Sequence, residues 1–289
     1  MIAYCSFGAG VQSTTIAFLA INRDRRLLEW SKGILPDVYV FADTGDEPVD
    51  LYPHVDEMKK SLAAAGADLV IVKHDKAQQW PLSANILNGA SKGKRIETLP
   101  FFVQRSTREG FAPTARNCTR TYKIRPIRRY VKARFKINRK SKGQLENWLG
   151  ISHDEPNRLR VSKDRWQVFR YPLFDLRLAR FDCLEYLKGC SYIDGSPVRA
   201  ARSACVFCPF HDKAEWRRVR NQPADWSRAV AIDEALETSF RKFGKIGALK
   251  SELFLTTTGQ RLRDLKFGDE PDPRRQFWDE DDCSGNCGV

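Results

Sequence analysis

The stretch that decides the fold is IAYCSFGAGVQSTTIAFLA, residues 2–20. It opens with the short apolar run IAYCSF, which predicts a buried strand. A loop of glycines and hydroxyl residues follows, and the apolar spacing from Val11 to Leu28 predicts a helix. A strand, a glycine loop and a helix in this order form the first half of a βαβ unit.

The same alternation continues outward along the chain. DVYVFAD (37–43) and DLVIVKHD (68–75) predict two more strands, and Val49 to Ala65 between them has helical spacing. ENWLGIS (146–152) and WQVFRYPL (166–173) predict further strands. Regular alternation of strands and helices gives right-handed parallel crossovers. The predicted fold class is therefore α/β, a doubly wound, mainly parallel sheet covered on both faces.

Between and beyond these strands the pattern changes. The segment from Lys76 to Phe111, with its scattered glycines and Pro100, predicts a long excursion over the carboxyl edge of the sheet. Tyr122 to Phe135 reads as a helix with Pro126 in its first turn. Asp182 is suited to cap a helix that begins at Cys183, and Glu215 to about Phe243 reads as mostly helical.

These elements predict three parts of the chain. Residues 1–175 form the α/β domain, residues 176–268 form a mostly helical, cysteine-rich part, and residues 269–289 form an acidic, flexible tail. With 289 residues and 42% hydrophobic content, the chain can bury a large core, or a core and a smaller subdomain. No stretch approaches the roughly 18 uncharged apolar residues of a membrane span, and the start MIAYCSFGAG does not read as a secretory signal. We expect a soluble, cytoplasmic protein.

The net charge of +13 is concentrated in one segment. Between Arg105 and Lys142 there are 14 Lys or Arg residues against one acid, Glu109, and the rest of the chain is balanced. Such a segment favours an anionic partner, either nucleotide phosphates or a nucleic-acid backbone. The alternative is a solvated helical face without a partner.

Three kinds of phosphate loop compete for residues 6–14. A Walker loop needs Lys before Ser13, where this chain has Gln12. A dinucleotide fingerprint needs a third glycine at the position of Ser13, although Asp43 imitates its ribose acid. A tight structural turn is the alternative without a ligand. The best match is a loop that surrounds a phosphate with hydroxyl and amide groups, supplied by Ser6, Gly8, Gly10, Ser13 and Thr14.

Two segments resemble the PP-loop ATP pyrophosphatases of the phosphoadenosine-phosphosulfate (PAPS) reductase-like group, also called adenine nucleotide alpha hydrolases. They are SFGAGVQST and, after it, FADTGDE (41–47). Four later segments resemble that group's motifs in the same order: NCTRTYKIRPI (117–127), GISHDEPNR (150–158), RYPL (170–173) and SACVFCPFH (203–211). The resemblance covers roughly residues 1–220. The loop departs from the usual S-G-G-x-D-S, because Gln12 replaces the acid and the turn is one residue longer.

The resemblance implies cleavage of ATP between its α and β phosphates. By position, the five loop residues would hold phosphate, with Ser13 in a catalytic role, and Asp43, Thr44 and Gly45 would line the nucleotide pocket. A pyrophosphate leaving group needs cations, and the candidates are Arg116, Arg120, Lys123 and Arg125. Mg²⁺ is expected as well, with Asp43, Asp154 or Glu155 as candidate ligands, although each of these suits a helix cap or an ion pair equally.

The chain has eight cysteines, and without a secretory signal we expect metal or redox chemistry rather than a disulfide framework. The C-x-x-C of Cys205 and Cys208 leaves zinc, an iron–sulfur cluster and two reduced thiols open. The resemblance implies a 4Fe-4S cluster on Cys118, Cys205 and Cys208, with Cys183 preferred to Cys190 as fourth ligand. For Cys183 and Cys190 the alternative is a small buried hydrophobic residue.

The chain ends in DDCSGNCGV, where Cys287 and Gly288 resemble the E-C-G-L-H tail of sulfonucleotide reductases, with Asn286 in place of the glutamate. A catalytic Cys287 on a mobile tail is one interpretation; a dangling end or a Cys283–Cys287 disulfide is the other.

Three functions follow from these features. The leading hypothesis is an ATP-cleaving enzyme of sulfur transfer to nucleic acid, as in DNA phosphorothioation or RNA thiolation, with a cysteine desulfurase or another sulfur donor as partner. The second is a sulfonucleotide (APS or PAPS) reductase that uses Cys287. The third is a non-enzymatic, zinc-stabilised nucleic-acid-binding module, which leaves the phosphate loop without a purpose.

Overall fold

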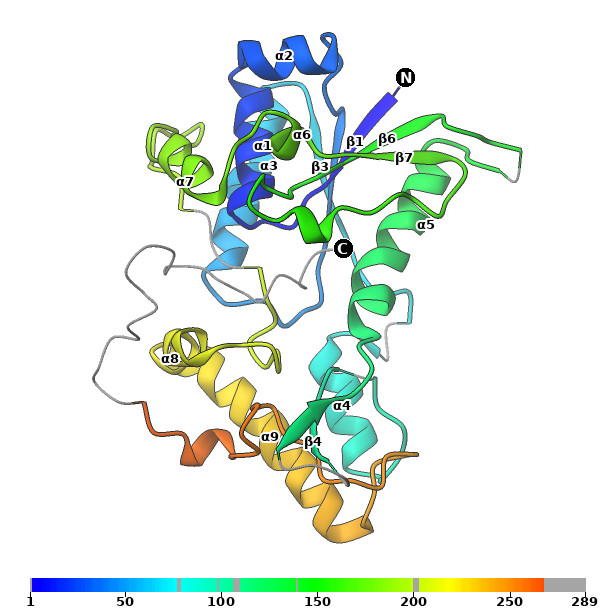
Figure 1. Ribbon diagram of the computed structural model, residues 1–289, viewed down its shortest axis with the longest axis vertical. Coiled ribbons are helices and arrows are strands. Elements are labelled where there is room, and N and C mark those ends of the chain that lie inside the picture. Colours follow the sequence, from blue (N-terminus) through cyan, green and yellow to red (C-terminus); the bar gives the residue numbers. More distant parts are fainter. Residues whose placement is uncertain are drawn as a thin grey trace.

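The computed structural model describes residues 2–76, 79–97, 99–105, 110–138, 140–199 and 203–267. Its centre is a sheet of five parallel strands in the order β3-β2-β1-β6-β7 (Figure 1). The strands are β1 (Ile2–Ser6), β2 (Val38–Ala42), β3 (Asp68–Val72), β6 (Leu145–Leu149) and β7 (Gln167–Arg170). The strand positions predicted from the apolar runs are confirmed.

Helices cover both faces of this sheet, as the alternating pattern predicts. One face packs against the helices α1, α2, α3, α6 and α7 through a large apolar core, and Trp148 of β6 and Phe18 of α1 belong to it. The other face packs against α5, where Val131 meets Tyr4 and Val40. The helices are α1 (Val11–Ile21), α2 (Arg25–Ser31), α3 (Leu51–Ala64), α5 (Arg125–Arg134), α6 (Pro172–Asp175) and α7 (Arg180–Lys188). The fold is α/β with a mostly parallel sheet and flanking helices.

Several predicted boundaries are wrong in detail. The helix expected from Val11 to Leu28 is two helices, because Asp24 accepts hydrogen bonds from the backbone N–H groups of Arg26 and Leu27 and starts α2. The helix expected to begin at Cys183 begins at Arg180. Asp182 lies in its first turn and accepts a hydrogen bond from the backbone N–H of Ala179 at 2.8 Å, so it still caps the helix.

The excursion expected between Lys76 and Phe111 contains regular structure of its own. It includes helix α4 (Leu82–Ala90) and strand β4 (Phe102–Gln104), which pairs antiparallel with β5 (Phe111–Pro113). A π-helical turn, η2 (Thr119–Ile124), then leads directly into α5, and Pro126 lies in the first turn of α5 as predicted. The short alternation of apolar and polar residues in 82–104 hides this helix and strand from pattern analysis.

A second apolar core lies beside the sheet domain, in the lower half of Figure 1. The helices α8 (Lys213–Arg220) and α9 (Pro223–Phe243) pack there with α4, the β4–β5 hairpin and Tyr122 of η2. The predicted helical run from Glu215 to Phe243 is broken at Pro223, which begins α9. The core therefore combines residues 82–122 with residues 206–262, whereas α7 packs on the sheet.

Two short 3₁₀ turns, η3 (Pro156–Arg158) and η4 (Leu262–Asp264), complete the described elements. The buried Arg261 connects η4 to α9, because its guanidinium donates a hydrogen bond to Asp233 Oδ1 at 3.0 Å.

Among the described residues, no helix has the length and apolar character needed to cross a bilayer.

The strand order places a topological switch point between β1 and β6. The chain leaves β1 for β2 and β3 on one side and returns to β6 on the other, so Ser6 at the end of β1 lies opposite Val40 of β2 and Leu149 of β6. The loops after β1 and β6 both leave the sheet at this carboxyl edge. In open parallel sheets, ligands bind at the carboxyl edge beside such a switch point.

Candidate functional site

The loop after β1 presents the amino end of α1 to the switch point. Gly10 is the N-cap of α1 and offers no side chain, so no side-chain cap satisfies the first N–H groups, and the first turn carries no acid. Ala9 has φ +58°, which turns the backbone sharply between the two glycines. A helix start without a side-chain cap and without an acid in its first turn favours an anion, because the first N–H groups and the helix dipole carry partial positive charge there.

Gly150, directly after β6, lies against the first turn of α1. A Cβ at this position would lie 2.8 Å from the backbone nitrogen of Ser13 and 3.1 Å from its Cα. Only glycine lets the loop after β6 pack on the first turn of α1. Gly150 opens the motif GISHDEPNR, but the sequence alone predicts no role for it, since its partner lies about 140 residues away along the chain.

The hydroxyl residues of the loop divide into two groups. Ser6 donates to Asn147 Oδ1 at 2.9 Å, and Ser13 donates to the Gly10 carbonyl at 3.1 Å, so both lie at the switch point. Thr14 is fully buried, and its Oγ1 lies 3.0 Å from His54 Nε2 on α3. Gly8 is exposed at the mouth of the loop. The structure thus brings Ser6, Gly8, Gly10 and Ser13 together and turns the side chain of Thr14 away toward α3.

Gln12 links the loop to the segment after β6 and to the first residue of α7. Its Nε2 donates to Glu155 Oε2 at 3.2 Å, and its Oε1 accepts from Arg180 at 3.0 Å. Glu155 also pairs with Arg158 at 2.5 Å, and Asp154 Oδ1 accepts from the backbone N–H of Arg180 at 3.1 Å. Asp154 and Glu155, named from sequence as candidate Mg²⁺ ligands, therefore have protein partners in this network.

The end of β2 forms a second turn beside the loop. Asp43 Oδ1 accepts from the Gly45 N–H at 2.7 Å and from the Tyr52 hydroxyl at 3.2 Å. Gly45 has φ +80°, and a Cβ there would lie 2.4 Å from Pro81 Cβ. The Trp80 indole donates to the Asp43 carbonyl at 3.1 Å, so an aromatic ring closes over this turn. These contacts hold the turn at the carboxyl edge, where the resemblance places a nucleotide.

The residues after Gly45 join the sheet to the second core. Asp46 Oδ2 accepts from the Ser83 N–H at the start of α4 at 2.7 Å, and burial raises the pKa of Asp46 to about 6. Glu47 is fully buried, and its Oε1 lies 3.3 Å from Lys123 Nζ and accepts from the Thr44 hydroxyl at 3.1 Å. Lys123, named from sequence as a phosphate cation, is thus paired with a buried carboxylate.

Three of the four predicted metal-binding cysteines line one small cavity. Cys118, Cys205 and Cys208 surround a space of about 30 Å³ together with Thr44, Arg116 and Lys123. Cys205 Sγ lies 3.2 Å from Thr44 Oγ1, and burial raises the pKa of the Cys205 thiol well above its usual range. The cavity therefore joins the end of β2 to the C-x-x-C segment and to η2.

Cys183 lies elsewhere, in the core under α1 and α7. Its carbonyl oxygen is 3.5 Å from Thr15 Oγ1, and burial raises the pKa of its thiol to about 12. Cys190 belongs to the same core. Both positions match the small buried hydrophobic residue that sequence analysis gave as the alternative.

The described cysteines do not complete a four-ligand set. Thiolates at Cys118, Cys205 and Cys208 are donors that suit zinc or an iron–sulfur cluster. Within the residues that the structure describes, however, no group of three or more His, Cys, Asp or Glu side chains is placed to hold a metal ion. Cys183, packed in the other core, does not join the three as a fourth ligand.

The remaining predicted cations are spread along η2 and α5. Arg116 stacks over the Phe210 ring at 5.6 Å, and Arg120 is exposed and donates to Asn117 at 3.4 Å. Arg125, at the start of α5, is also exposed. Cys287 and Cys283 lie outside the described residues, as does the predicted tail.

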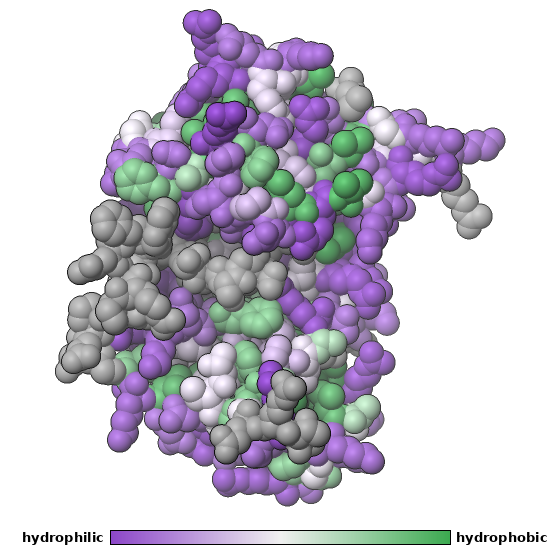
Figure 2. Space-filling model, viewed as in Figure 1, coloured by the Kyte–Doolittle hydropathy of each residue, from purple (hydrophilic) through white to green (hydrophobic). Residues whose placement is uncertain are grey.

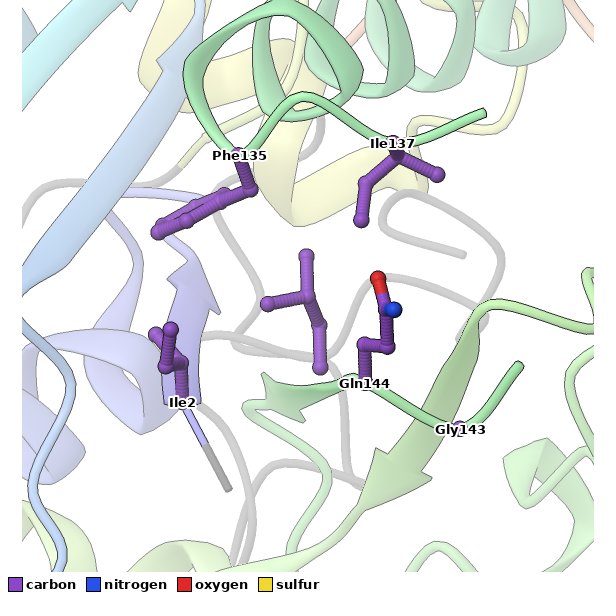
Figure 3. A pocket seen from close by; sticks show the side chains of 6 residues that line it. Ile2, Phe135, Ile137, Gly143 and Gln144 are labelled. Carbon is purple, nitrogen blue, oxygen red and sulfur yellow. The ribbon is translucent and has the colours of Figure 1, made fainter. Parts of the chain in front are cut away.

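An open pocket of about 430 Å³ lies at the opposite edge of the sheet (Figure 3). It is lined by Ile2 and Leu145, the first residues of β1 and β6, together with Phe135, Ile137, Gly143 and Gln144. Because the amino ends of parallel strands are not where such sheets bind ligands, the candidate site remains the carboxyl edge.

No family model matches the chain, and no curated protein matches it significantly.

Proposed function

We propose that the chain is an enzyme that binds ATP at the loop after β1 and cleaves it between the α and β phosphates, with release of pyrophosphate. The observation that carries the proposal is the uncapped, acid-free start of α1 at the switch point, against which Gly150 packs. The main-chain N–H groups there match the charge of a polyphosphate. The resemblance to PP-loop ATP pyrophosphatases supports the choice of nucleotide and of the bond that breaks.

Each group has a defined task in this proposal. The loop amides and the Ser13 hydroxyl bind the phosphates, and the turn of Asp43, Thr44 and Gly45, closed by Trp80, receives the nucleoside. Charge that develops on the pyrophosphate is stabilised by fixed donors at the helix start and by cations at the edge, among which we place Arg116 and Lys123. Mg²⁺ accompanies the triphosphate, as in other phosphoryl-group chemistry.

We further propose that the activated acceptor belongs to a nucleic acid and that the chemistry is sulfur transfer, with an external sulfur donor such as a cysteine desulfurase. The basic segment from Arg105 to Lys142 supports a nucleic-acid acceptor. The cavity lined by Cys118, Cys205 and Cys208 supports a role for sulfur or for a metal beside the nucleotide turn. A 4Fe-4S cluster, with zinc as the alternative, is proposed for these thiols, and no step of the reaction is assigned to it.

The test is pyrophosphate release from ATP and Mg²⁺ by protein purified without oxygen, with and without DNA or tRNA. Ser13→Ala should lower the rate at least tenfold, with a loss of stability no larger than the about 0.5–1.5 kcal/mol of its hydrogen bond to the Gly10 carbonyl. Thr14→Ala is the matched control: it should lower stability, since the Thr14 hydroxyl contacts the buried His54 on α3. Equal rates in wild type and Ser13→Ala would defeat the proposed site.

Metal content is measured on the same protein. Iron with equimolar sulfide would support the 4Fe-4S cluster, and zinc would support the zinc site. An active enzyme without bound metal would contradict both proposals. Nucleotide binding without pyrophosphate release would instead favour the sulfonucleotide reductase, for which the loss of sulfonucleotide reduction in Cys287→Ser is the direct check.

A further inference from the structure

Helix α5 has one apolar face and one strongly basic face. Ile127, Tyr130 and Val131 pack against the sheet. Arg125, Arg129 and Lys132, spaced four and three residues apart, are exposed on the other side. Residues at this spacing share one helix face. The loop after the helix continues the series with three more exposed cations, Lys136, Lys140 and Lys142.

Few carboxylates neutralise the positive charge of this face. The sequence from Gly110 to Leu145 contains no Asp or Glu. Arg129 pairs with Asp75 at 2.9 Å, and Arg128, on the flank of the helix, pairs with Asp164. Within the described part of the chain, no carboxylate forms an ion pair with Arg125, Lys132 or the three loop lysines. The face therefore keeps most of its positive charge.

The basic face runs the full height of the sheet, from the candidate site to the opposite edge. Helix α5 follows η2 directly, and Lys123 of η2 lines the cysteine cavity. At the other end, Phe135 and Ile137 lie beside the first residues of β1 and β6 (Figure 3). Ten residues of helix span about 15 Å. A charged chain bound along this face would have one end beside the cavity.

We infer that the outward face of α5, from Arg125 to Lys142, binds the sugar-phosphate backbone of a nucleic acid and directs it to the edge of the sheet where Lys123 lies. A linear polyanion fits a linear series of cations, and Arg and Lys are the usual phosphate contacts. None of the large apolar side chains exposed among the described residues belongs to α5, which argues against a membrane surface as the partner. Figure 2 shows hydrophilic side chains along the edge of the molecule where α5 lies in Figure 1.

This inference deepens the proposed function by naming the surface that receives the acceptor, and only the path toward the candidate site rests on that function. Binding itself is independent of ATP cleavage. The test is therefore a binding measurement, made with full-length protein and fluorescein-labelled oligonucleotides of about 20 nucleotides, single-stranded DNA, duplex DNA and RNA, without ATP.

The test variant reverses two charges on the face of α5, with Arg125→Glu and Lys132→Glu. The control variant makes the same charge change at exposed residues at and just beyond the end of α9, with Lys242→Glu and Lys245→Glu. We expect the α5 pair to weaken binding at least tenfold at about 0.1 M salt, and to reduce the slope of log K against log salt by about 1.4 for single strands and 1.8 for duplexes. The α9 pair should change binding less than twofold. Arg125→Gln with Lys132→Gln should give an intermediate loss at unchanged thermal stability.

Three results would overturn the inference: wild-type binding that does not depend on salt, an equal loss in both charge-reversed pairs, or unchanged binding in the α5 pair. A fluorescein-labelled polyglutamate that binds as tightly as the oligonucleotides would assign the face to an acidic protein segment instead. Pyrophosphate release without nucleic acid, measured on the same variants, separates the two proposals. If that activity is absent throughout while the α5 pair loses binding, the proposed function fails and the docking face stands.

Discussion

Thr14 Oγ1 lies 3.0 Å from His54 Nε2, and the other ring nitrogen of His54 lies 2.6 Å from the Tyr192 hydroxyl. This buried chain ties the first turns of α1 to α3 and to the segment after α7. Burial lowers the pKa of His54 to about 4, so the ring is neutral at physiological pH. A neutral imidazole donates at one nitrogen and accepts at the other, which suits two hydroxyl partners.

The first prediction concerns the pH dependence that His54 gives to stability. The pKa of His54 is near 6.5 when unfolded and about 4 when folded, so the unfolded chain binds more protons between these values. The stability is fully present above pH 6.5 and declines as the pH falls toward 4, by about 3 kcal/mol in all. His54→Gln should remove this decline, as measured by urea unfolding at several pH values. An unchanged pH profile in the variant would contradict the buried neutral ring.

The second prediction concerns Asp46, whose contribution to stability changes with pH in the opposite direction to that of His54. Burial raises its folded pKa to about 6, so its contribution to stability is present below pH 3.8 and is lost as the pH rises through 6. Asp46→Asn keeps an oxygen for the Ser83 N–H and should gain up to about 3 kcal/mol relative to wild type between pH 4 and pH 7. Chemical unfolding at the two pH values measures the difference. A relative loss of stability at pH 7 would mean that the charged carboxylate is favoured, for instance by Arg228, whose Nη1 lies 3.9 Å away.

The five strands of the central sheet could be predicted from sequence because each is a short apolar run that ends in polar or glycine residues, as DVYVFAD does. The helix α4 could not be predicted, because its stability comes from packing against α9 in the second core, not from a strong pattern of its own. Contacts decide such segments more than local propensity does.

Part of the candidate site could be predicted from sequence for the same reason. Gly10 lies in the loop that follows one predicted strand and Asp43 ends another, so strand order alone brings them to one edge. The contacts of Gly150 with Ser13 and of His54 with Thr14 join residues distant in sequence, and they are visible only in the folded chain. The assignment of Cys183 as a fourth ligand relied on a sequence position, and packing placed it in a different core from Cys205.

Gly150 and Gly10 make a matched pair of glycines for a third prediction. A Cβ at Gly150 would lie 2.8 Å from Ser13 N, whereas a Cβ at Gly10 would meet no atom within 4 Å. Gly150→Ala should therefore cost about 1–3 kcal/mol of stability, because backbone must move to relieve the contact. Gly10→Ala should cost less, about 1 kcal/mol at most, because alanine is a poorer N-cap than glycine, and it should weaken ATP binding if phosphate lies against that backbone. Calorimetric unfolding and nucleotide titration of both variants check this, and equal stabilities would show that the loop after β6 does not press on α1.

The last prediction concerns the buried pair of Lys123 and Glu47. Glu47 is fully buried, and among the described residues its Oε2 accepts no hydrogen bond, so its charge depends on Lys123 at 3.3 Å and on the Thr44 hydroxyl. Lys123→Met should therefore destabilise the fold by about 3–5 kcal/mol, because a buried carboxylate loses its cation.

Adding Glu47→Gln removes the stranded charge and should restore most of that stability, which makes the double variant the decisive comparison. Lys132→Met, an exposed lysine on α5, serves as the control and should change stability by less than about 0.5 kcal/mol. If the double variant is no more stable than Lys123→Met, the lysine acts through packing and not through charge. If it recovers stability but not pyrophosphate release, Lys123 has a second task at the cavity, which is the role proposed for it beside the nucleotide.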